Sequence, residues 1–307
     1  MKNFLAKYKI KKSENIIVAC SGGSDSMFLI HELVKVKNKK SLIITHFNHN
    51  LRAKESNRDE KFVVDYCKKN GFFCEVGKGN IKKLSKEKKI GIEETARLFR
   101  YEFLKKVKEK YNARFIFTAH HLDDKIETFV FNLIRGSKLT GLISIEEKNG
   151  DILRPLLKIS KNKILEECKK NNISYIEDSS NKSDKVLRNY IRIHIIPHFS
   201  KINSNYQIAF NRLMDYFGEL KSYFDLEIEK ILINNSFEIK IFSNFPEFMQ
   251  KECIRYIYEK ANSGTIGLSE GNITEIIRFI NDKGNHTIKE IKKMKLKKIN
   301  GKVYIYE

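Results

Sequence analysis

The residues with the clearest chemistry lie at positions 21 to 26, where the sequence reads Ser-Gly-Gly-Ser-Asp-Ser. Two glycines let a backbone turn sharply and approach a ligand closely, and the serines add hydroxyl donors. A helical pattern follows, so the unpaired N–H groups of a helix N-terminus would face the same ligand. This combination predicts a phosphate-binding loop formed by Ser21, Gly22, Gly23, Ser24, Asp25 and Ser26.

Asp25 is unusual in such a loop, because a carboxylate repels phosphate. It is explained if Asp25 helps to hold a Mg²⁺ ion that bridges the phosphates of a nucleotide. The alternative is a helix start that is merely capped, since Ser and Asp are common capping residues. No Gly-x-x-x-x-Gly-Lys-Ser/Thr occurs, which excludes a Walker-type loop.

Asp124 and Glu127 form a second chemical group. They are three residues apart at the start of a predicted helix, so their side chains share one face, with Asp123 beside them. Two carboxylates on one face can hold an ammonium group. The alternative is an acidic first turn that complements the helix dipole.

Basic and imidazole side chains form a third group. Arg97 and Arg100 are three apart on a predicted helix and suit phosphate oxygens, although ion pairs with nearby glutamates are an alternative. His46 and His49 flank the end of a predicted strand. They are not interpreted as metal ligands, because no third soft ligand accompanies them. Further basic residues predicted to contact phosphates or nucleic acid, or else to be solvated surface charges, are Arg135, Lys138, Arg188 and Arg192.

These residues need a scaffold that brings them to one edge. Short apolar runs predict strands at 15–21, 41–47, 72–76 and 114–120, and amphipathic patterns predict helices from about 26 and at 55–69, 92–110 and 123–134. Such alternation predicts a doubly wound, mainly parallel α/β sheet of the Rossmann-like kind. The loop at 21–26 then lies at the carboxyl end of a strand, where ligands bind in open α/β sheets.

The alternation stops after about residue 178. Helical patterns at 185–198 and 204–232 are followed by a smaller unit with helices at 247–261 and 270–281 and strands at 287–291 and 302–306. We expect three parts: a catalytic domain over 1–203, a helical connection over 204–235, and a small α+β domain over 236–307.

The amino-acid composition limits the classes of function that this chain can have. The 307 residues carry a net charge of +21, which favours an acidic partner such as nucleic acid. Only 12 of the 59 basic residues are Arg, so an AT-biased coding sequence is an alternative source of the lysines. No apolar run is long enough for a membrane span, and five cysteines without a CxxC pair predict reduced thiols in a cytoplasmic protein.

Seven motifs occur in a characteristic order. They begin with the loop at 21–26 and continue with His46–Arg52, His120–Thr128, Arg135–Leu142, Arg154–Leu157, Asp178–Asn181 and Arg188–Arg192. Together they resemble the bacterial tRNA(Ile)-lysidine synthetases, a family of PP-loop ATP pyrophosphatases. The resemblance is strong over residues 15–200 and looser beyond them.

The resemblance implies an enzyme that joins free L-lysine to C2 of the wobble cytidine in an isoleucine tRNA with a CAU anticodon. ATP, with Mg²⁺, would first adenylylate the C2 oxygen and release pyrophosphate, and the lysine amine would then displace AMP. It also implies that Asp25, Asp124 and Glu127 are catalytic, that Asp124 and Glu127 recognise lysine, and that Arg97 and Arg100 face the site. His49, at the end of a predicted strand, is a further candidate for a phosphate or tRNA contact, with a packed or capping histidine as the alternative. We expect the C-terminal unit, with its lysines between 289 and 298, to bind the tRNA body or the acceptor arm.

The chain departs from the family pattern in two ways. Asn48 stands where an acid is often found, and we expect the chain to end before the further C-terminal domain of longer relatives. The rival function is a tRNA thiolase, which needs a persulfide-forming Cys pair or a cluster-binding CxxC. A catalytically silent RNA-binding protein is the third alternative, and the oligomeric state is open.

Overall fold

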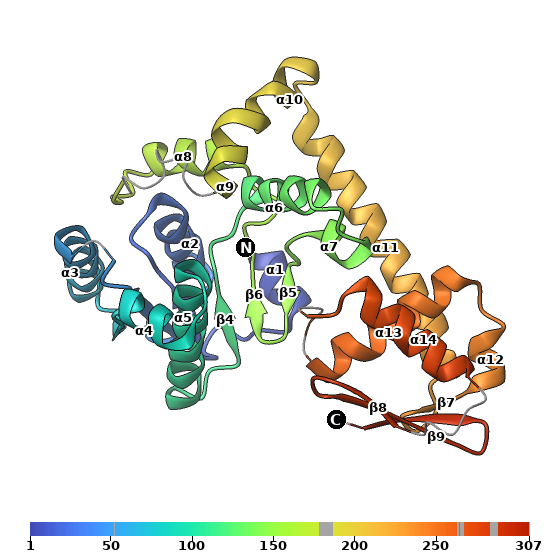
Figure 1. Ribbon diagram of the computed structural model, residues 1–307. Helices are drawn as coiled ribbons and strands as arrows, with labels where there is room; N and C mark the ends of the chain where they lie inside the picture. Colours follow the sequence, from blue (N-terminus) through green and yellow to red (C-terminus); the bar gives the residue numbers. More distant parts are fainter. Residues whose placement is uncertain (52, 178–186, 263, 265–266, 283–287, 307) are drawn as a thin grey trace. The chain divides into compact units, whose positions relative to one another are not determined.

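The computed structural model describes residues 1–51, 53–177, 187–262, 264, 267–282 and 288–306 (Figure 1). The chain divides into two compact units, Met1–Met214 and Asp215–Glu307. The division falls inside the long helix α11 (Tyr206–Ile231), in the region expected to connect two domains. No helix within these ranges combines the length and apolar character needed to cross a bilayer.

The N-terminal unit is built on a six-stranded sheet with the order β3-β2-β1-β4-β6-β5. All neighbouring strands are parallel except the pair β5–β6. This confirms the predicted doubly wound, mainly parallel α/β fold. The strands are β1 (Ile16–Ala19), β2 (Leu42–Asn48), β3 (Phe73–Lys78), β4 (Phe115–Phe117), β5 (Lys148–Asn149) and β6 (Ile152–Leu153).

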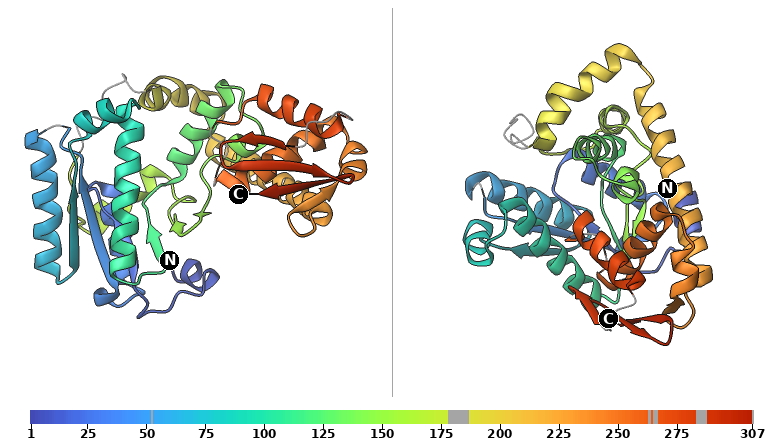
Figure 2. Two further views of the ribbon diagram at one scale, coloured as in Figure 1. Left: turned by 60° about the horizontal axis from the view of Figure 1, so that its bottom comes forward. Right: turned by 45° about the vertical axis from the view of Figure 1, so that its right-hand side comes forward.

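The apolar strands are buried on both faces. Alternate residues point to opposite faces of a strand, so Ile16 and Val18 join one hydrophobic cluster and Ile17 joins another. Apolar residues of α2 (Ser24–Val34), α3 (Ala53–Asn70) and α8 (Lys161–Lys170) belong to the first cluster, and those of α5 (Ile92–Lys110) to the second. Helices therefore cover both faces of the sheet, and its strands lie between α3 and α5 (Figure 2, left).

The strand order sets the position of the ligand site. From β1 the chain moves outward through β2 and β3, and then returns to the other side of β1 with β4. This reversal places a crevice between the carboxyl ends of β1 and β4, the point where ligands bind in open α/β sheets. The loop at 21–26 follows β1, and residues 118–121 follow β4, so both lie at this crevice.

Helices predicted from long amphipathic patterns are confirmed, whereas short elements were not predicted. α5 spans the predicted range 92–110, and α6 (Leu122–Ile134) begins one residue before its prediction. In the N-terminal unit, the elements without a prediction include α1 (Lys2–Lys7), α4 (Ile81–Lys88), α7 (Leu139–Ile143), α8, β5 and β6. Each of them presents few apolar residues to the core, so its periodicity is weak.

The predicted helix at 185–198 is interrupted. The described part consists of α9 (Leu187–Tyr190), a π-helical turn (Ile191–Ile195) and α10 (Ile196–Ile202). Pro197 lies in the first turn of α10. Because proline has no backbone N–H to donate, it suits a new helix start and breaks the preceding hydrogen-bond ladder.

The C-terminal unit has a four-stranded antiparallel sheet with the order β7-β10-β9-β8. Its lysine-rich segment forms β9, in which Met294 and Leu296 are buried while Lys295 between them is exposed. This period-2 alternation was visible in the sequence, but no strand was predicted there. The elements are β7 (Ser236–Glu238), α12 (Ile239–Ser243), α13 (Glu247–Asn262), α14 (Glu270–Asn281), β8 (Ile288–Ile291), β9 (Met294–Ile299) and β10 (Lys302–Tyr306).

Candidate active site

The loop between β1 and α2 makes a sharp turn that depends on glycine. Gly22 adopts a φ of +88°, which L-residues with a side chain rarely do, and a Cβ there would lie 3.3 Å from side-chain carbons of Ile176 and Val63. The Gly22 carbonyl accepts a hydrogen bond of 2.9 Å from the backbone N–H of Ile176. Gly23 is the N-cap of α2, and the Ser26 hydroxyl donates back to its carbonyl. The loop therefore leads directly into a helix N-terminus, as predicted.

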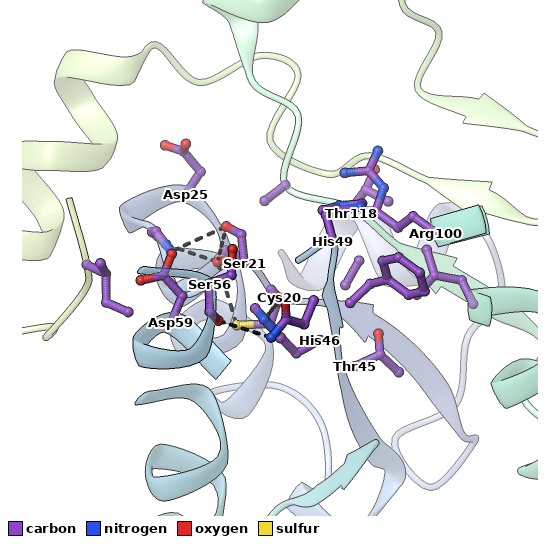
Figure 3. A pocket seen from close by; sticks show the side chains of 18 of the residues that line it. Cys20, Ser21, Asp25, Thr45, His46, His49, Ser56, Asp59, Arg100 and Thr118 are labelled. Carbon is purple, nitrogen blue, oxygen red and sulfur yellow. Dashed lines mark hydrogen bonds between the residues drawn. The ribbon is translucent and has the colours of Figure 1, made fainter. Parts of the chain in front are cut away.

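A pocket of about 340 Å³ opens at this edge of the sheet (Figure 3). Its size lies in the range of small-molecule sites. The lining comes from the ends of β1, β2 and β4 and from the facing turns of α2, α3, α5 and α6. Side chains from positions far apart in the sequence, such as Asp25, His49 and Arg100, surround the same space (Figure 3).

The pocket brings together about half of the residues singled out from the sequence. Those that line it are Ser21, Gly23, Asp25, Ser26, His46, His49, Arg100 and Asp124. Two residues of the loop do not line the pocket: Gly22 is buried, and the Ser24 hydroxyl accepts a hydrogen bond from Lys161. Those outside the lining are Glu127, Arg97, Arg135, Arg188 and Arg192.

Asp25 is bound by a lysine that the sequence did not single out. The Lys161 ammonium lies 2.6 Å from Asp25 Oδ1 and 2.7 Å from Ser24 Oγ. The backbone N–H of Lys161 donates to Asp123 Oδ2 at 2.7 Å. Ser160, the N-cap of α8, was a signal for a helix start at this point. No local signal connects Lys161 with the phosphate loop.

Glu127 and Arg192 form a bidentate ion pair. Glu127 is fully buried, and its two oxygens accept hydrogen bonds of 2.6 and 2.8 Å from Nε and Nη2 of Arg192. Burial raises the pKa of Glu127, and the guanidinium opposes that rise. Arg192 also lies 3.8 Å from Asp124 Oδ1. Asp124 and Glu127 therefore share one face, as predicted, and their charges act on one cation.

His121 sits among three carboxylates. It is buried, and its ring nitrogens lie 3.8 Å from Asp25, 3.6 Å from Asp123 and 3.5 Å from Asp124. Burial lowers the pKa of His121, but the three carboxylates outweigh this effect, so its pKa is raised overall. The sequence analysis did not select His121 by itself, although it lies within the His120–Thr128 motif.

The other histidines of the pocket favour the neutral form. Burial, followed by the charge of Arg100, lowers the pKa of His49 to about 4. Burial likewise lowers the pKa of His46, and burial with nearby arginines places the pKa of His120 well below its usual value. These rings can therefore donate and accept hydrogen bonds at neutral pH without adding charge.

The remaining arginines occupy more open positions. Arg97 is exposed, and both it and Arg100 lie against the Tyr101 ring, with Cζ 5.3 and 5.2 Å from its centroid. Arg135 is exposed beside the ring of Phe131, and Arg188 donates to the Thr128 hydroxyl at 3.0 Å.

Asn48 has a structural partner where the family pattern often has an acid. Its buried amide donates to Glu60 Oε2 at 2.7 Å and to Asn57 Oδ1 at 3.2 Å, which ties the end of β2 to α3. Two other parts of the predicted motifs, Arg52 and the segment 178–181, lie outside the described residues.

Two curated proteins that are similar to this chain carry the same name. A tRNA(Ile)-lysidine synthase of Bacteroides thetaiotaomicron is 36% identical over 217 residues, which cover 71% of this chain and 50% of the relative. Another, of Bacillus cereus, is 31% identical over 289 residues, covering 88% of this chain and 60% of the relative. The chain thus spans about half to three fifths of the length of these relatives.

Solved structures and family profiles give the fold. A U34-tRNA thiolase of Methanococcus maripaludis superposes with a TM-score of 0.59 at 19% identity, covering 71% of this chain and 77% of that one. At this identity the likeness shows a common fold only. The profile of the PP-loop domain matches residues 1–199, which include the loop, the six-stranded sheet and every residue of the pocket. The chain therefore belongs to the PP-loop domain family.

Proposed function

We propose that this protein is a tRNA(Ile)-lysidine synthetase, which uses ATP to join L-lysine to C2 of the wobble cytidine of a CAU-anticodon isoleucine tRNA. The single observation that carries the proposal is the pocket in which a PP-loop and the acid Asp124 face each other at the carboxyl edge of the sheet. The name shared by the curated relatives supports the choice of substrate.

ATP is the proposed nucleotide. The turn at Gly22 and Gly23, the N-terminus of α2 and the serine hydroxyls offer donors for phosphate oxygens. Arg100 adds a positive charge from the opposite wall of the pocket. The neutral rings of His46 and His49 leave room for an uncharged base beside the end of β2.

Mg²⁺ fits the donor set. This ion is held by one or two carboxylates together with phosphate oxygens, and both Asp25 and Asp124 line the pocket. In the part of the chain that the structure describes, no three or more His, Cys, Asp or Glu side chains form an all-protein metal site. The ion would supply charge neutralisation for the phosphates, with Asp25 as its main protein ligand.

The first proposed step is transfer of AMP to the tRNA. The C2 oxygen of the cytidine forms a bond to the α-phosphorus while the bond from that phosphorus to the bridging oxygen breaks, and pyrophosphate leaves. The chain contributes by holding the triphosphate in line on the loop and by stabilising the negative charge of the leaving group. The open mouth of the pocket admits an unstacked base.

The second proposed step is attack of the lysine amine on C2, which releases AMP. The amine gives up a proton to solvent, and the new C–N bond replaces the C–O bond to AMP, which leaves. Asp124 and Glu127 already hold one cation, Arg192, and a lysine ammonium carries the same charge. We infer that these acids position the lysine beside the activated base.

Basic side chains would hold the tRNA. Arg135 and Arg188 are exposed beside the candidate site's α6, and the strands β9 and β10 carry the exposed Lys295 and Lys302. Such contacts go mostly to phosphate and sugar, so they would position the tRNA without reading its sequence. The bases of the anticodon loop would provide the specificity within the pocket.

The direct test is incubation with ATP, labelled lysine and a transcript of the CAU-anticodon isoleucine tRNA. The expected result is label at the wobble position together with one pyrophosphate per lysine. Matched controls are a methionine tRNA transcript with the same anticodon and an isoleucine transcript with uridine at the wobble position, and neither should take up label. Absence of label with the cognate transcript would overturn the proposal.

The thiolase alternative makes a different prediction. Both enzymes would release pyrophosphate when they adenylylate the tRNA, but a thiolase would release AMP without lysine, whereas the proposed enzyme releases AMP only when lysine is present. The five cysteines are free, and four of them are buried, namely Cys20, Cys67, Cys168 and Cys253. Thiolation of the transcript by a sulfide donor would replace the proposed function.

A further inference from the structure

Lys161 is held at the phosphate loop by packing between distant elements. It begins α8, whose residues Ile164 and Cys168 are buried in the same core cluster as α2. Cys168 Sγ lies 3.7 Å from the Ser24 carbonyl, and the backbone N–H of Lys161 is bound by Asp123 of α6. The backbone of Lys161 is therefore fixed by α2, α6 and α8 together, while its side chain remains about one third exposed.

The charges of the pocket do not by themselves suit a polyanion. Of the described residues that line it, Arg100 is the one with a permanent positive charge, against the carboxylates of Asp25, Asp59 and Asp124. The histidines His46, His49 and His120 favour the neutral form because burial lowers their pKa. Apart from the Mg²⁺ ion proposed at Asp25, a triphosphate on the loop would therefore meet no positive charge close to Asp25 from the described side chains that line the pocket.

We propose that Lys161 is a phosphate-binding residue, whose ammonium turns from Asp25 to the β- and γ-phosphate oxygens when ATP occupies the loop. This inference rests on the proposed use of ATP. In the structure, the ammonium bonds the first two residues of α2, which places it at the mouth of the loop. A lysine stem is flexible and carries three donors, so the ammonium can exchange partners while Cα stays fixed.

The exchange is energetically reasonable. Asp25 and Lys161 are each partly exposed, with side-chain exposures of 28% and 35%, and ion pairs of this kind contribute little. Hydrogen bonds from an ammonium to phosphate oxygens are charge-assisted and stronger. In the empty pocket, Lys161 keeps Asp25 oriented. With nucleotide bound, it stabilises the charge that grows on departing pyrophosphate.

The alternative is a purely structural role, in which Lys161 only fastens α8 to α2. Lys161→Met tests the difference, because it keeps most of the apolar stem and removes the charge. Lys161→Arg retains the charge and should restore binding. The matched control is Lys163→Met, which removes a charge two residues further along α8, where Lys163 is exposed and pairs with Glu166 and Glu167.

The experiment measures binding of α,β-methylene-ATP to the full chain by calorimetry, with Mg²⁺ and again with EDTA. Lys161→Met should weaken binding about 10- to 100-fold in both conditions, the range for losing a hydrogen bond to a charged group. Lys161→Arg should bind within a few-fold of wild type, and Lys163→Met should not differ from it. AMP, which lacks the outer phosphates, should bind wild type and Lys161→Met equally.

Thermal unfolding without nucleotide completes the test. The inference predicts similar melting temperatures for all four proteins. It is overturned if Lys161→Met binds α,β-methylene-ATP as tightly as wild type, if AMP affinity falls equally, or if the variant melts much earlier and Arg does not restore binding. If wild type itself binds no α,β-methylene-ATP, the proposed function fails together with this inference. Undiminished binding by Lys161→Met would reject the inference alone.

Discussion

Glu127 is a buried carboxylate that pairs with Arg192, and we propose that it also binds the lysine substrate. Its side chain is 1% exposed, and the bidentate contact with Arg192 compensates for the loss of hydration. A buried charge without such a partner is strongly disfavoured. If lysine binds here, its ammonium replaces some of the hydrogen bonds that the Arg192 guanidinium now donates to Glu127, so one cation takes the place of another.

Glu127→Gln should separate lysine binding from nucleotide binding. The amide keeps the shape but loses the charge, so we expect the KM for lysine to rise about 10- to 100-fold, as for loss of a charged hydrogen bond. The KM for ATP should change by less than about threefold, because Glu127 lies outside the pocket lining. Steady-state kinetics with each substrate varied in turn gives both values.

Two measurements guard this interpretation. Urea unfolding should show that Glu127→Gln loses about 1–3 kcal/mol, because Arg192 is left with a weaker partner but can reach solvent. Glu166→Gln, at an exposed residue of α8, is the control and should change neither KM. An equal rise in both KM values for Glu127→Gln would remove the assignment of Glu127 to lysine.

His49 gives a prediction for the pH dependence of stability. Its pKa in the folded protein is about 4, mainly because of burial, while an unfolded histidine titrates near 6.5. Below pH 6.5 the unfolded chain binds the proton first, so the free energy of unfolding falls as the pH drops towards 4. The contribution of His49 is present above pH 6.5 and amounts to at most about 3 kcal/mol.

The measurement compares urea unfolding of wild type and His49→Gln at pH 7.5 and pH 5. Between pH 7.5 and pH 5, the free energy of unfolding of the variant should fall less than that of wild type, because the variant lacks the lowered pKa of His49. Equal losses in the two proteins would show that His49 titrates normally in the fold. Lowered pKa values of His46 and His120 should leave some pH dependence in the variant.

The turn between β1 and α2 depends on Gly22 for its shape. Gly22→Ala introduces a side chain at a φ of +88° and within 3.3 Å of Ile176 and Val63. We expect a loss of about 1–2 kcal/mol in stability and at least a tenfold loss in affinity for α,β-methylene-ATP, since the loop must move to admit the Cβ. Calorimetry and urea unfolding measure the two effects.

Gly71→Ala is the matched control for this element. Gly71 follows α3 with a φ of +70°, but a Cβ there would meet no atom within 4 Å. Gly71→Ala should lose a similar amount of stability, because alanine is strained at a positive φ, and it should keep its affinity for the nucleotide. If both glycine variants bind the nucleotide like wild type, the shape of the 21–26 loop is not what binds phosphate.

Charge acts at the level of the whole molecule. The net charge of +21 includes lysines along β8–β10, where alternation turns Met294 and Leu296 into the core and Lys295 outward. Basic contacts to RNA release counterions, so affinity for tRNA should fall steeply with salt. A flat salt response would count against a basic tRNA surface.

A pair of charge-removing variants locates the contacts. Lys293→Gln with Lys297→Gln should reduce the slope of log K against log salt by about 1–2, the contribution of two phosphate contacts. The control, Lys11→Gln with Lys40→Gln, changes the same charge at exposed residues near the amino ends of β1 and β2. Filter binding at several salt concentrations measures all three slopes, and equal slopes for the two double variants would reject the β9 contact.

Patterns within short stretches of sequence were enough for the main architecture. Buried strands, the long helices, a glycine turn between β1 and α2, and the shared face of Asp124 and Glu127 depend on neighbours a few residues apart, and the structure confirms them. The binding of phosphate by that turn stays a prediction. Short elements such as α8 were missed because Ile164 and Cys168 provide too little periodicity. Secondary-structure propensity and the pattern of burial depend on residues a few positions apart, so a short segment of sequence is enough to predict its own helix or strand.

Contacts between distant segments required the folded chain. The bond of Lys161 to Asp25 spans 136 residues, and the bond of Arg192 to Glu127 spans 65. The same is true of His121, whose environment combines the first turns of α2 and α6. An ammonium or guanidinium selects a carboxylate only after packing has placed the two within reach, and no property of either residue's own neighbours encodes that distance.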